Sequence, residues 1–178
     1  MAKYYQWRAF ARDVAITCGV AVVGGLGVAT LADALLPQKG HAYTYERELI
    51  ERTAEDYVGV KVLWARGNTN GCKPNLLGFY SLPKRTVIMC EATIETIPQM
   101  METLKHETWH GVQHVCNGNR PVLNDDQLRN GMTRSDRRIL RSAYPPAQHR
   151  LEAEARVVGQ LPTPNFIDGV QVYCSRRT

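Results

Sequence analysis

The sequence lacks several patterns that mark common classes of protein. No block of residues recurs at a fixed period, which excludes solenoids and propellers. Of its 178 residues, 44% are hydrophobic and 22% are charged, a composition that excludes disordered, collagen-like and coiled-coil chains. The length therefore suits one globular domain with an additional segment, and it is too short for two full domains.

Aromatic residues are also few, at 8%, whereas the formal net charge is +5. That charge alone would suit a nucleic-acid-binding protein. The densest basic cluster comprises Arg134, Arg137, Arg138 and Arg141, and neither interleaved aromatic residues nor a nucleic-acid-binding motif accompanies it. We therefore expect these arginines to form a solvated helix face, and we expect no nucleic-acid partner.

The first 36 residues differ from the rest of the chain. Residues 14–32 carry no charge, and in a helix they would span about 28 Å, close to the hydrocarbon thickness of a bilayer. Lys3, Arg8 and Arg12 precede this run, and a basic flank on that side predicts that the N-terminus stays in the cytoplasm while the rest crosses. Residues 1–36 are thus predicted to be a transmembrane anchor or signal segment, followed by a domain of residues 37–178.

The anchor and the signal predict different locations. Ala32-Asp33-Ala34 fits the small-residue pattern of a cleavage site. An uncleaved helix would make a single-pass membrane protein whose domain lies outside the cytoplasm, and cleavage would make a secreted or periplasmic protein. The third interpretation is a Gly/Ala-rich helix buried in a soluble assembly.

No cysteine pair has the CxxC spacing of a zinc knuckle or a thioredoxin-type redox pair. Four cysteines follow the apolar run, and an even number beyond a translocation signal suggests two disulfides, with three possible connectivities. Cys72 with Cys90 would join the base of a hairpin, and Cys116 with Cys174 would tie the C-terminal tail to the domain. The alternative is four reduced thiols in a cytosolic protein.

The pattern of apolar residues predicts an α+β fold. A helix is expected over residues 42–58, ended by Gly59, and a strand over 60–65. Strands over 76–80 and 86–90 would form a hairpin. Further helices are predicted over 98–116, 127–142 and 147–160, and a short strand over 170–174 or an ordered tail ends the chain. This order indicates a small, mostly antiparallel sheet packed on helices.

Residues 106–110 read His-Glu-Thr-Trp-His within one predicted helix. His106 and His110 lie one turn apart on the same face, so both imidazoles can bind one metal ion, usually Zn²⁺ for nitrogen ligands. Glu107 is rotated by about 100° and can reach a water on that metal. The pattern is typical of metal-assisted hydrolysis, in which the metal lowers the pKa of water from about 15.7 toward 7 and a carboxylate takes the proton.

A catalytic zinc site needs a third protein ligand and an open position for water. His114 is too distant, because three histidines on successive turns spread over about 12 Å. The HExxHxxGxxH pattern is excluded, since Gln113 and Cys116 stand at its Gly and His positions. The remaining candidate is the predicted helix that contains Glu152 and Glu154.

An HExxH helix followed by a helix with a glutamate ligand resembles the gluzincin group of zinc metallopeptidases. The second helix of that group shows Glu-x-x-x-Asp, often with Ala before the Asp, and Glu152-Ala153-Glu154-Ala155 matches its start. The resemblance covers residues 86–158 and implies a minimal zincin-like domain. It implies Glu107 as the catalytic base, Glu154 as a reserve ligand, and a zinc site formed by His106, His110 and Glu152.

Arg156 departs from the gluzincin pattern. It occupies the position of the family's Asp, which supports a metal-bound histidine. In that fold, the strand before the active-site helix is an edge strand that receives an extended peptide, a role expected here for residues 86–90. Tyr144 and His149 are candidate donors to the oxyanion that forms during hydrolysis.

These features predict a membrane-anchored or exported zinc-dependent peptidase that hydrolyses peptide or protein substrates with metal-activated water. The N-terminal helix would be its membrane contact, and a larger assembly is compatible with the sequence. The alternative is a non-catalytic structural or interaction subunit of a membrane complex or larger particle that retains the zinc site.

Overall fold

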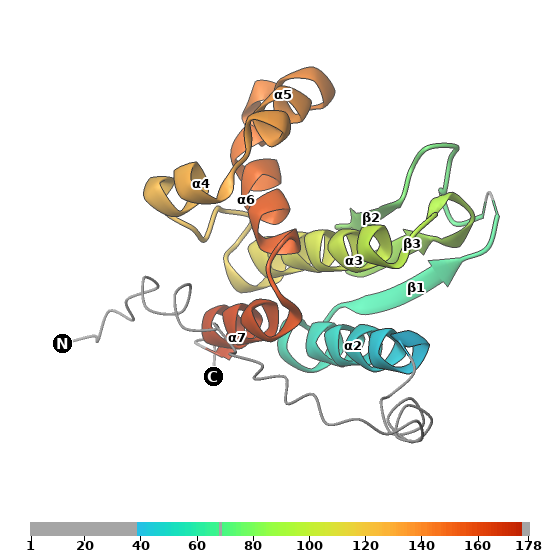
Figure 1. The fold of residues 1–178 in the computed structure, drawn as a ribbon. Coiled ribbons are helices and arrows are strands. Elements are labelled where there is room, and N and C mark those ends of the chain that lie inside the picture. Colours follow the sequence, from blue (N-terminus) through green and yellow to red (C-terminus); the bar gives the residue numbers. More distant parts are fainter. Residues whose placement is uncertain (1–38, 68, 176–178) are drawn as a thin grey trace, which may run out of the picture. The chain divides into compact units, whose positions relative to one another are not determined.

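The computed structural model describes residues 39–67 and 69–175 (Figure 1). The predicted N-terminal anchor or signal segment lies outside these residues. Contacts divide the chain into two units, Met1–Pro37 and Gln38–Thr178, and every element below belongs to the second. Within the described part, no helix combines the length and apolar character needed to cross a bilayer.

The described residues form an α+β domain with a three-stranded mixed sheet and six α-helices. The strands are β1 (Lys61–Ala65), β2 (Gly78–Ser81) and β3 (Thr86–Cys90). The helices are α2 (Lys39–Thr53), α3 (Ile97–Gly111), α4 (Asp125–Gly131), α5 (Arg134–Ala143), α6 (His149–Gly159) and α7 (Thr163–Cys174). Two π-helical turns, Ala54–Val58 and Val112–Cys116, extend α2 and α3.

The sheet has the order β1-β3-β2, with β1 parallel and β2 antiparallel to β3. The predicted hairpin of β2 and β3 is confirmed. The expectation of a mostly antiparallel sheet is wrong for the β1–β3 pair, and residues 86–90 form the central strand rather than an edge. β3 is buried at four of its five positions, whereas exposed and partly buried residues alternate along most of β1. The more apolar strand is therefore the central one.

Helix α3 covers one face of the sheet, where Tyr80, Val87 and Met89 share the main core with Leu104. A smaller apolar cluster on the opposite face includes Cys72 and Cys90. The Cys72–Cys90 and Cys116–Cys174 disulfides are both present, which confirms the predicted pairing. The second one links the end of the α3 segment to α7.

Residues 127–142 do not form the single predicted helix. Met132 and Thr133 have extended backbones and separate α4 from α5. The Oγ1 of Thr133 accepts a hydrogen bond from the Asp136 N–H, and the Asp136 carboxylate accepts one from the Thr133 N–H. This reciprocal cap starts a new helix, and the Thr-x-x-Asp spacing in the sequence was its signal.

The predicted strand over residues 170–174 is wrong, because these residues end α7. Phe166, Val170 and Cys174 recur every four residues and are all buried, which is a helical spacing. Trp109 packs against α7, with ring centroids 6.4 Å from Phe166 and 5.9 Å from Tyr173. Trp109 thus connects α3 to α7.

Replacing Thr133 with Ala should lower the free energy of unfolding by about 1 kcal/mol, because the first turn of α5 loses its cap. Thr133→Ser should retain most of the stability. Urea unfolding measures both. Ser135→Ala, an exposed change in the same turn, is the matched control and should stay within about 0.5 kcal/mol of the unaltered protein. Equal stability of Thr133→Ala and Ser135→Ala would contradict the capping role.

Candidate metal centre

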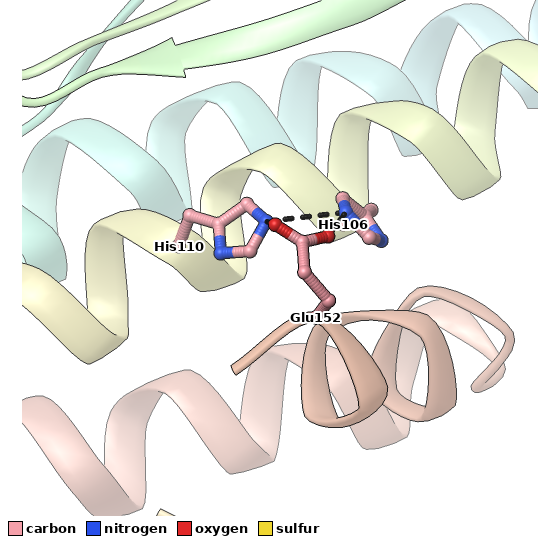
Figure 2. A group of neighbouring side chains, drawn as sticks. All are labelled: His106, His110 and Glu152. Atoms are coloured by element: carbon pink, nitrogen blue, oxygen red, sulfur yellow. Dashed lines mark hydrogen bonds and ion pairs between the residues drawn. The ribbon is translucent and has the colours of Figure 1, made fainter. Parts of the chain in front are cut away.

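The site lies where α6 packs against α3. Thr96 caps the start of α3, where its side chain accepts a hydrogen bond from the Gln99 N–H. Gly159 permits the close approach of α6, since a Cβ there would lie 3.1 Å from the Glu102 carbonyl oxygen and 3.4 Å from the His106 Cβ. This packing brings Glu152 of α6 opposite the two histidines of α3 (Figure 2).

Three side chains converge at this contact. The Nε2 atoms of His106 and His110 are 3.1 Å apart. The two carboxylate oxygens of Glu152 lie 3.4 Å from His106 Nε2 and 3.5 Å from His110 Nε2. The three ligand atoms lie within 4.8 Å of one another, and this is the one such group among the described residues. The three side chains keep 14–17% of their surface exposed, so solvent reaches them.

The charges of these groups depend on one another. Burial alone would raise the pKa of the Glu152 carboxyl, but its interactions with His106 and His110 outweigh burial and lower that pKa to about 2. Burial likewise favours neutral His110, yet its contact with Glu152 raises the pKa of His110 above the usual value. A carboxylate that stays ionised beside two imidazoles is a suitable donor set for a cation.

Glu107 lies beside the cluster without joining it. Its Oε1 atom is 4.0 Å from His106 Nε2. Burial raises the pKa of the Glu107 carboxyl above its usual value, although the two neighbouring histidines oppose the shift. The carboxylate also accepts a hydrogen bond from the backbone N–H of Tyr80 in β2. A carboxyl group with a raised pKa is suited to taking up and returning a proton.

Strand β2 is an edge strand of the sheet and lies next to Glu107. The Cys90 N–H donates to the Leu77 carbonyl oxygen at 2.8 Å, which makes these two residues a hydrogen-bonded pair. Because such pairs alternate along antiparallel strands, the N–H and C=O groups of Gly78 and Tyr80 face away from β3. The edge near the candidate base is therefore β2, not residues 86–90.

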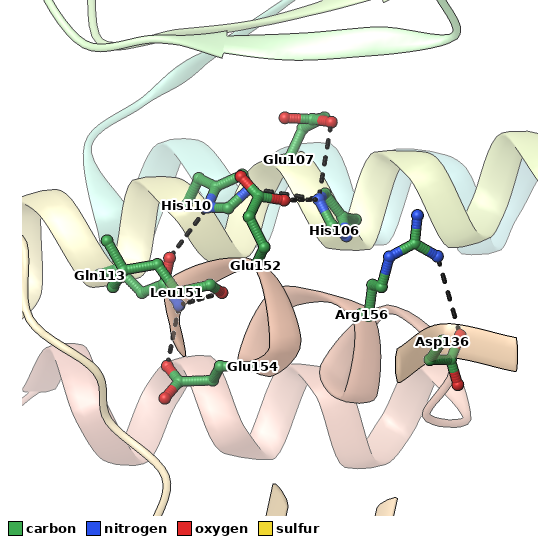
Figure 3. A network of polar contacts seen from close by, with 9 residues as sticks. All are labelled: His106, Glu107, His110, Gln113, Asp136, Leu151, Glu152, Glu154 and Arg156. Carbon is green, nitrogen blue, oxygen red and sulfur yellow. Dashed lines mark hydrogen bonds and ion pairs between the residues drawn. The ribbon is translucent and has the colours of Figure 1, made fainter. Parts of the chain in front are cut away.

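Glu154 does not belong to the cluster. It is fully buried, and its Oε1 accepts hydrogen bonds from Trp109 Nε1 at 2.8 Å and Gln113 Nε2 at 3.0 Å. Its Oε2 accepts from the backbone N–H groups of Val122 and Leu123 at 2.7 and 2.8 Å. These donors occupy both oxygens, so the structure brings Glu152 to the histidines and directs Glu154 into the interior (Figure 3).

Arg156 cannot accept a hydrogen bond from a histidine as the acidic residue of the gluzincin pattern does, because its side chain is a cation. Its Nη1 lies 3.7 Å from Asp136 Oδ1 in α5. The positive charge of Arg156 also opposes the rise that burial causes in the pKa of the nearby Tyr144 hydroxyl. Arg156 thus ties α5 to α6, one turn beyond Glu152.

The two candidate oxyanion donors differ in availability. His149 Nε2 lies 2.8 Å from the Tyr144 carbonyl oxygen, a bond that occupies this ring nitrogen. Burial raises the pKa of the Tyr144 hydroxyl, and the nearby charge of Glu152 raises it further. The Tyr144 hydroxyl is therefore protonated at neutral pH and close enough to Glu152 to sense its charge, which makes it the better placed donor.

Two participants escaped sequence reasoning. Gln113 donates to the Leu151 carbonyl oxygen at 3.0 Å. Its Oε1 also lies 2.9 Å from His110 Nδ1. Tyr80 contributes through its backbone, which carries no residue-type signal. The spacing of Gln113, three residues after His110, is the signal that could have placed it on the same face.

Comparison with known proteins adds no relative, since no protein-family model, curated protein or solved structure matches the chain. The site is therefore interpreted from its own geometry.

Acid should destabilise the metal-free protein partly through Glu152. Its folded pKa, about 2, lies below the value of about 4.3 for an unfolded glutamate. The stabilisation by its carboxylate is thus fully present above pH about 4.3 and is lost as the pH falls toward 2. In urea unfolding over that range, Glu152→Gln should weaken the decline in stability, and the exposed control Glu48→Gln should not. An unchanged decline in Glu152→Gln would contradict the pairing.

Proposed function

We propose that this chain is a zinc-dependent peptidase of minimal gluzincin-like architecture, with His106, His110 and Glu152 as the metal ligands. One observation carries the proposal: two imidazoles and one carboxylate from two helices converge on a single point. Glu107 lies beside that point without competing for it. Three ligands, a neighbouring carboxyl group and access for solvent are what a catalytic zinc site requires.

The donor set fits a zinc ion. A tetrahedral zinc ion with ligands at about 2.0–2.1 Å holds neighbouring donor atoms about 3.3 Å apart. Here the two Nε2 atoms are 3.1 Å apart, each lies 3.4–3.5 Å from a different oxygen of Glu152, and one oxygen lies with both nitrogens inside a span of 4.8 Å. In addition, Glu152 Oε2 is buried and has no hydrogen-bond donor. A buried carboxylate oxygen without a donor is costly, and a cation between Glu152 and the histidines would satisfy it.

When bound, zinc would supply a Lewis acid and lower the pKa of a water molecule at the open position. Glu107 would accept a proton from the attacking water and return it to the leaving amine, for which its raised pKa is suited. Tyr144 donates its hydroxyl hydrogen to the developing oxyanion.

The substrate would be an extended peptide that adds to the free edge of β2. The outward-facing backbone groups of Gly78 and the carbonyl oxygen of Tyr80 would pair with such a peptide. The Tyr80 N–H, which bonds Glu107, marks the point at which the peptide passes the candidate base. Backbone pairing would orient the peptide without demanding a particular side chain.

Export is part of the same proposal. Two disulfides within one small domain suit an oxidising compartment. The uncharged run of residues 14–32 would carry the domain across the membrane, either as a retained anchor or as a cleaved signal.

The central test removes the base and keeps the ligands. Glu107→Gln should lower peptide hydrolysis about 10²–10⁴-fold while zinc content stays at about one ion per chain. Glu102→Gln, an exposed change on the same helix, should leave both unchanged, and His106→Ala should lose the zinc. Hydrolysis that is unaffected in Glu107→Gln would overturn the peptidase assignment. Bound zinc with no hydrolysis in any variant would indicate a structural site instead.

The role of Tyr144 can be tested separately. Tyr144→Phe should lower kcat about 10²–10³-fold, because the oxyanion loses one donor, with little change in KM. Tyr57→Phe alters a tyrosine that is 44% exposed and serves as the control. Steady-state kinetics on one peptide substrate measures both variants, and a kcat for Tyr144→Phe equal to that of the control would remove Tyr144 from the mechanism.

A further inference from the structure

The side-chain amide of Gln113 can donate hydrogen bonds to both of its neighbouring acceptors in only one orientation. Gln113 is 1% exposed, and its Nε2 lies 3.0 Å from both the Leu151 carbonyl oxygen and Glu154 Oε1 (Figure 3). A carbonyl and an ionised carboxylate accept hydrogen bonds and cannot donate them. Turning the amide over would place its oxygen against two acceptors, so the NH₂ group must face Leu151 and Glu154.

Glu154 is itself fixed. Its other partners are the Trp109 indole N–H and the backbone N–H groups of Val122 and Leu123, all of which can only donate. The Glu154 side chain is completely buried. It therefore acts as a rigid acceptor that determines how the Gln113 amide is turned.

This orientation gives His110 Nδ1 an oxygen acceptor at hydrogen-bond distance, whereas the Glu152 carboxylate lies farther from Nε2, at 3.5 Å. With its NH₂ group engaged, Gln113 presents Oε1 to His110 Nδ1 at 2.9 Å. An oxygen acceptor requires a proton on Nδ1, and neutral imidazole then keeps a lone pair on Nε2. His110 Nε2 is the atom that faces His106 and Glu152.

We propose that Gln113 and Glu154 hold His110 in the Nδ1–H tautomer, the form that binds metal through Nε2. Gln113 is thus a positioning residue, an inference that rests on the proposed function for the role of Nε2. Histidine ligands commonly donate their second ring N–H to an oxygen that fixes their orientation. Here a glutamine on the ligand helix supplies that oxygen, in a chain whose α6 carries Arg156 where an acidic residue was expected.

The tautomer can be observed without metal or substrate. Proton–nitrogen NMR of the histidine rings, at a pH above their titration, should show the His110 proton on Nδ1 in the metal-free protein. Gln113→Met keeps the side-chain length and removes both hydrogen-bonding groups. It should shift His110 toward the Nε2–H form that a neutral histidine side chain prefers in water. Gln148→Met, an exposed change beside the start of α6, is the matched control and should leave the His110 signal unchanged.

Zinc titration provides the second measurement. Gln113→Met should weaken zinc binding about 10–100-fold, the usual effect of losing a partner of a ligand, and Gln148→Met should not. A His110 proton on Nε2 in the unaltered protein would overturn the inference, as would an unchanged tautomer in Gln113→Met. If Gln113→Met does not fold, the spectrum of the unaltered protein decides alone.

The inference and the proposed function fail separately. An Nδ1–H His110 in a protein that binds no zinc would contradict the proposed function and support the fixed tautomer. If the protein binds zinc but its metal-free His110 carries the proton on Nε2, the proposed function is supported and the fixed tautomer is contradicted.

Discussion

The close packing of α6 on α3 is the constraint on which the site depends. The histidines share a face of α3 by their spacing alone, but a third donor reaches them only because α6 passes close by. Gly159 allows that approach, since a side chain there would press on the backbone of α3. Along α6, Glu152 then faces the histidines, Glu154 faces the interior and Arg156 contacts Asp136.

Glu154 connects the site to the rest of the domain. Its carboxylate joins α3 through Trp109 and Gln113 to the loop at Val122 and Leu123. A buried carboxylate with donors on both oxygens avoids the cost of an unpaired charge and gives a defined geometry. The same carboxylate determines the orientation of the Gln113 amide. One buried group therefore links the interior packing to His110, a proposed metal ligand.

Local patterns in the sequence predicted the parts of the site that lie on one helix. The spacing of His106 and His110 and the rotation of Glu107 follow from helix geometry. The cysteine pairs and the α2, α3 and α6 segments were also predicted. Choosing between Glu152 and Glu154 required knowing which face of α6 meets α3, and that depends on contacts between distant residues.

The errors in the sequence prediction have the same origin. Whether a strand is central or at an edge is decided by its neighbours, so β3 could not be placed from residues 86–90 alone. The four-residue spacing of Phe166, Val170 and Cys174 was a helical signal that the nearby Pro164 and Gly169 obscured. Thr133 and Asp136 formed a recognisable cap, and it should have divided the predicted helix.

The most direct test is a calorimetric titration of zinc into the metal-free protein and into its Glu152→Ala variant. The account predicts about one zinc ion per chain and a loss of affinity of at least about tenfold when the carboxylate is removed. Equal affinity in the two proteins, or no binding by the unaltered protein, would contradict the convergence of Glu152 and the two histidines on one ion.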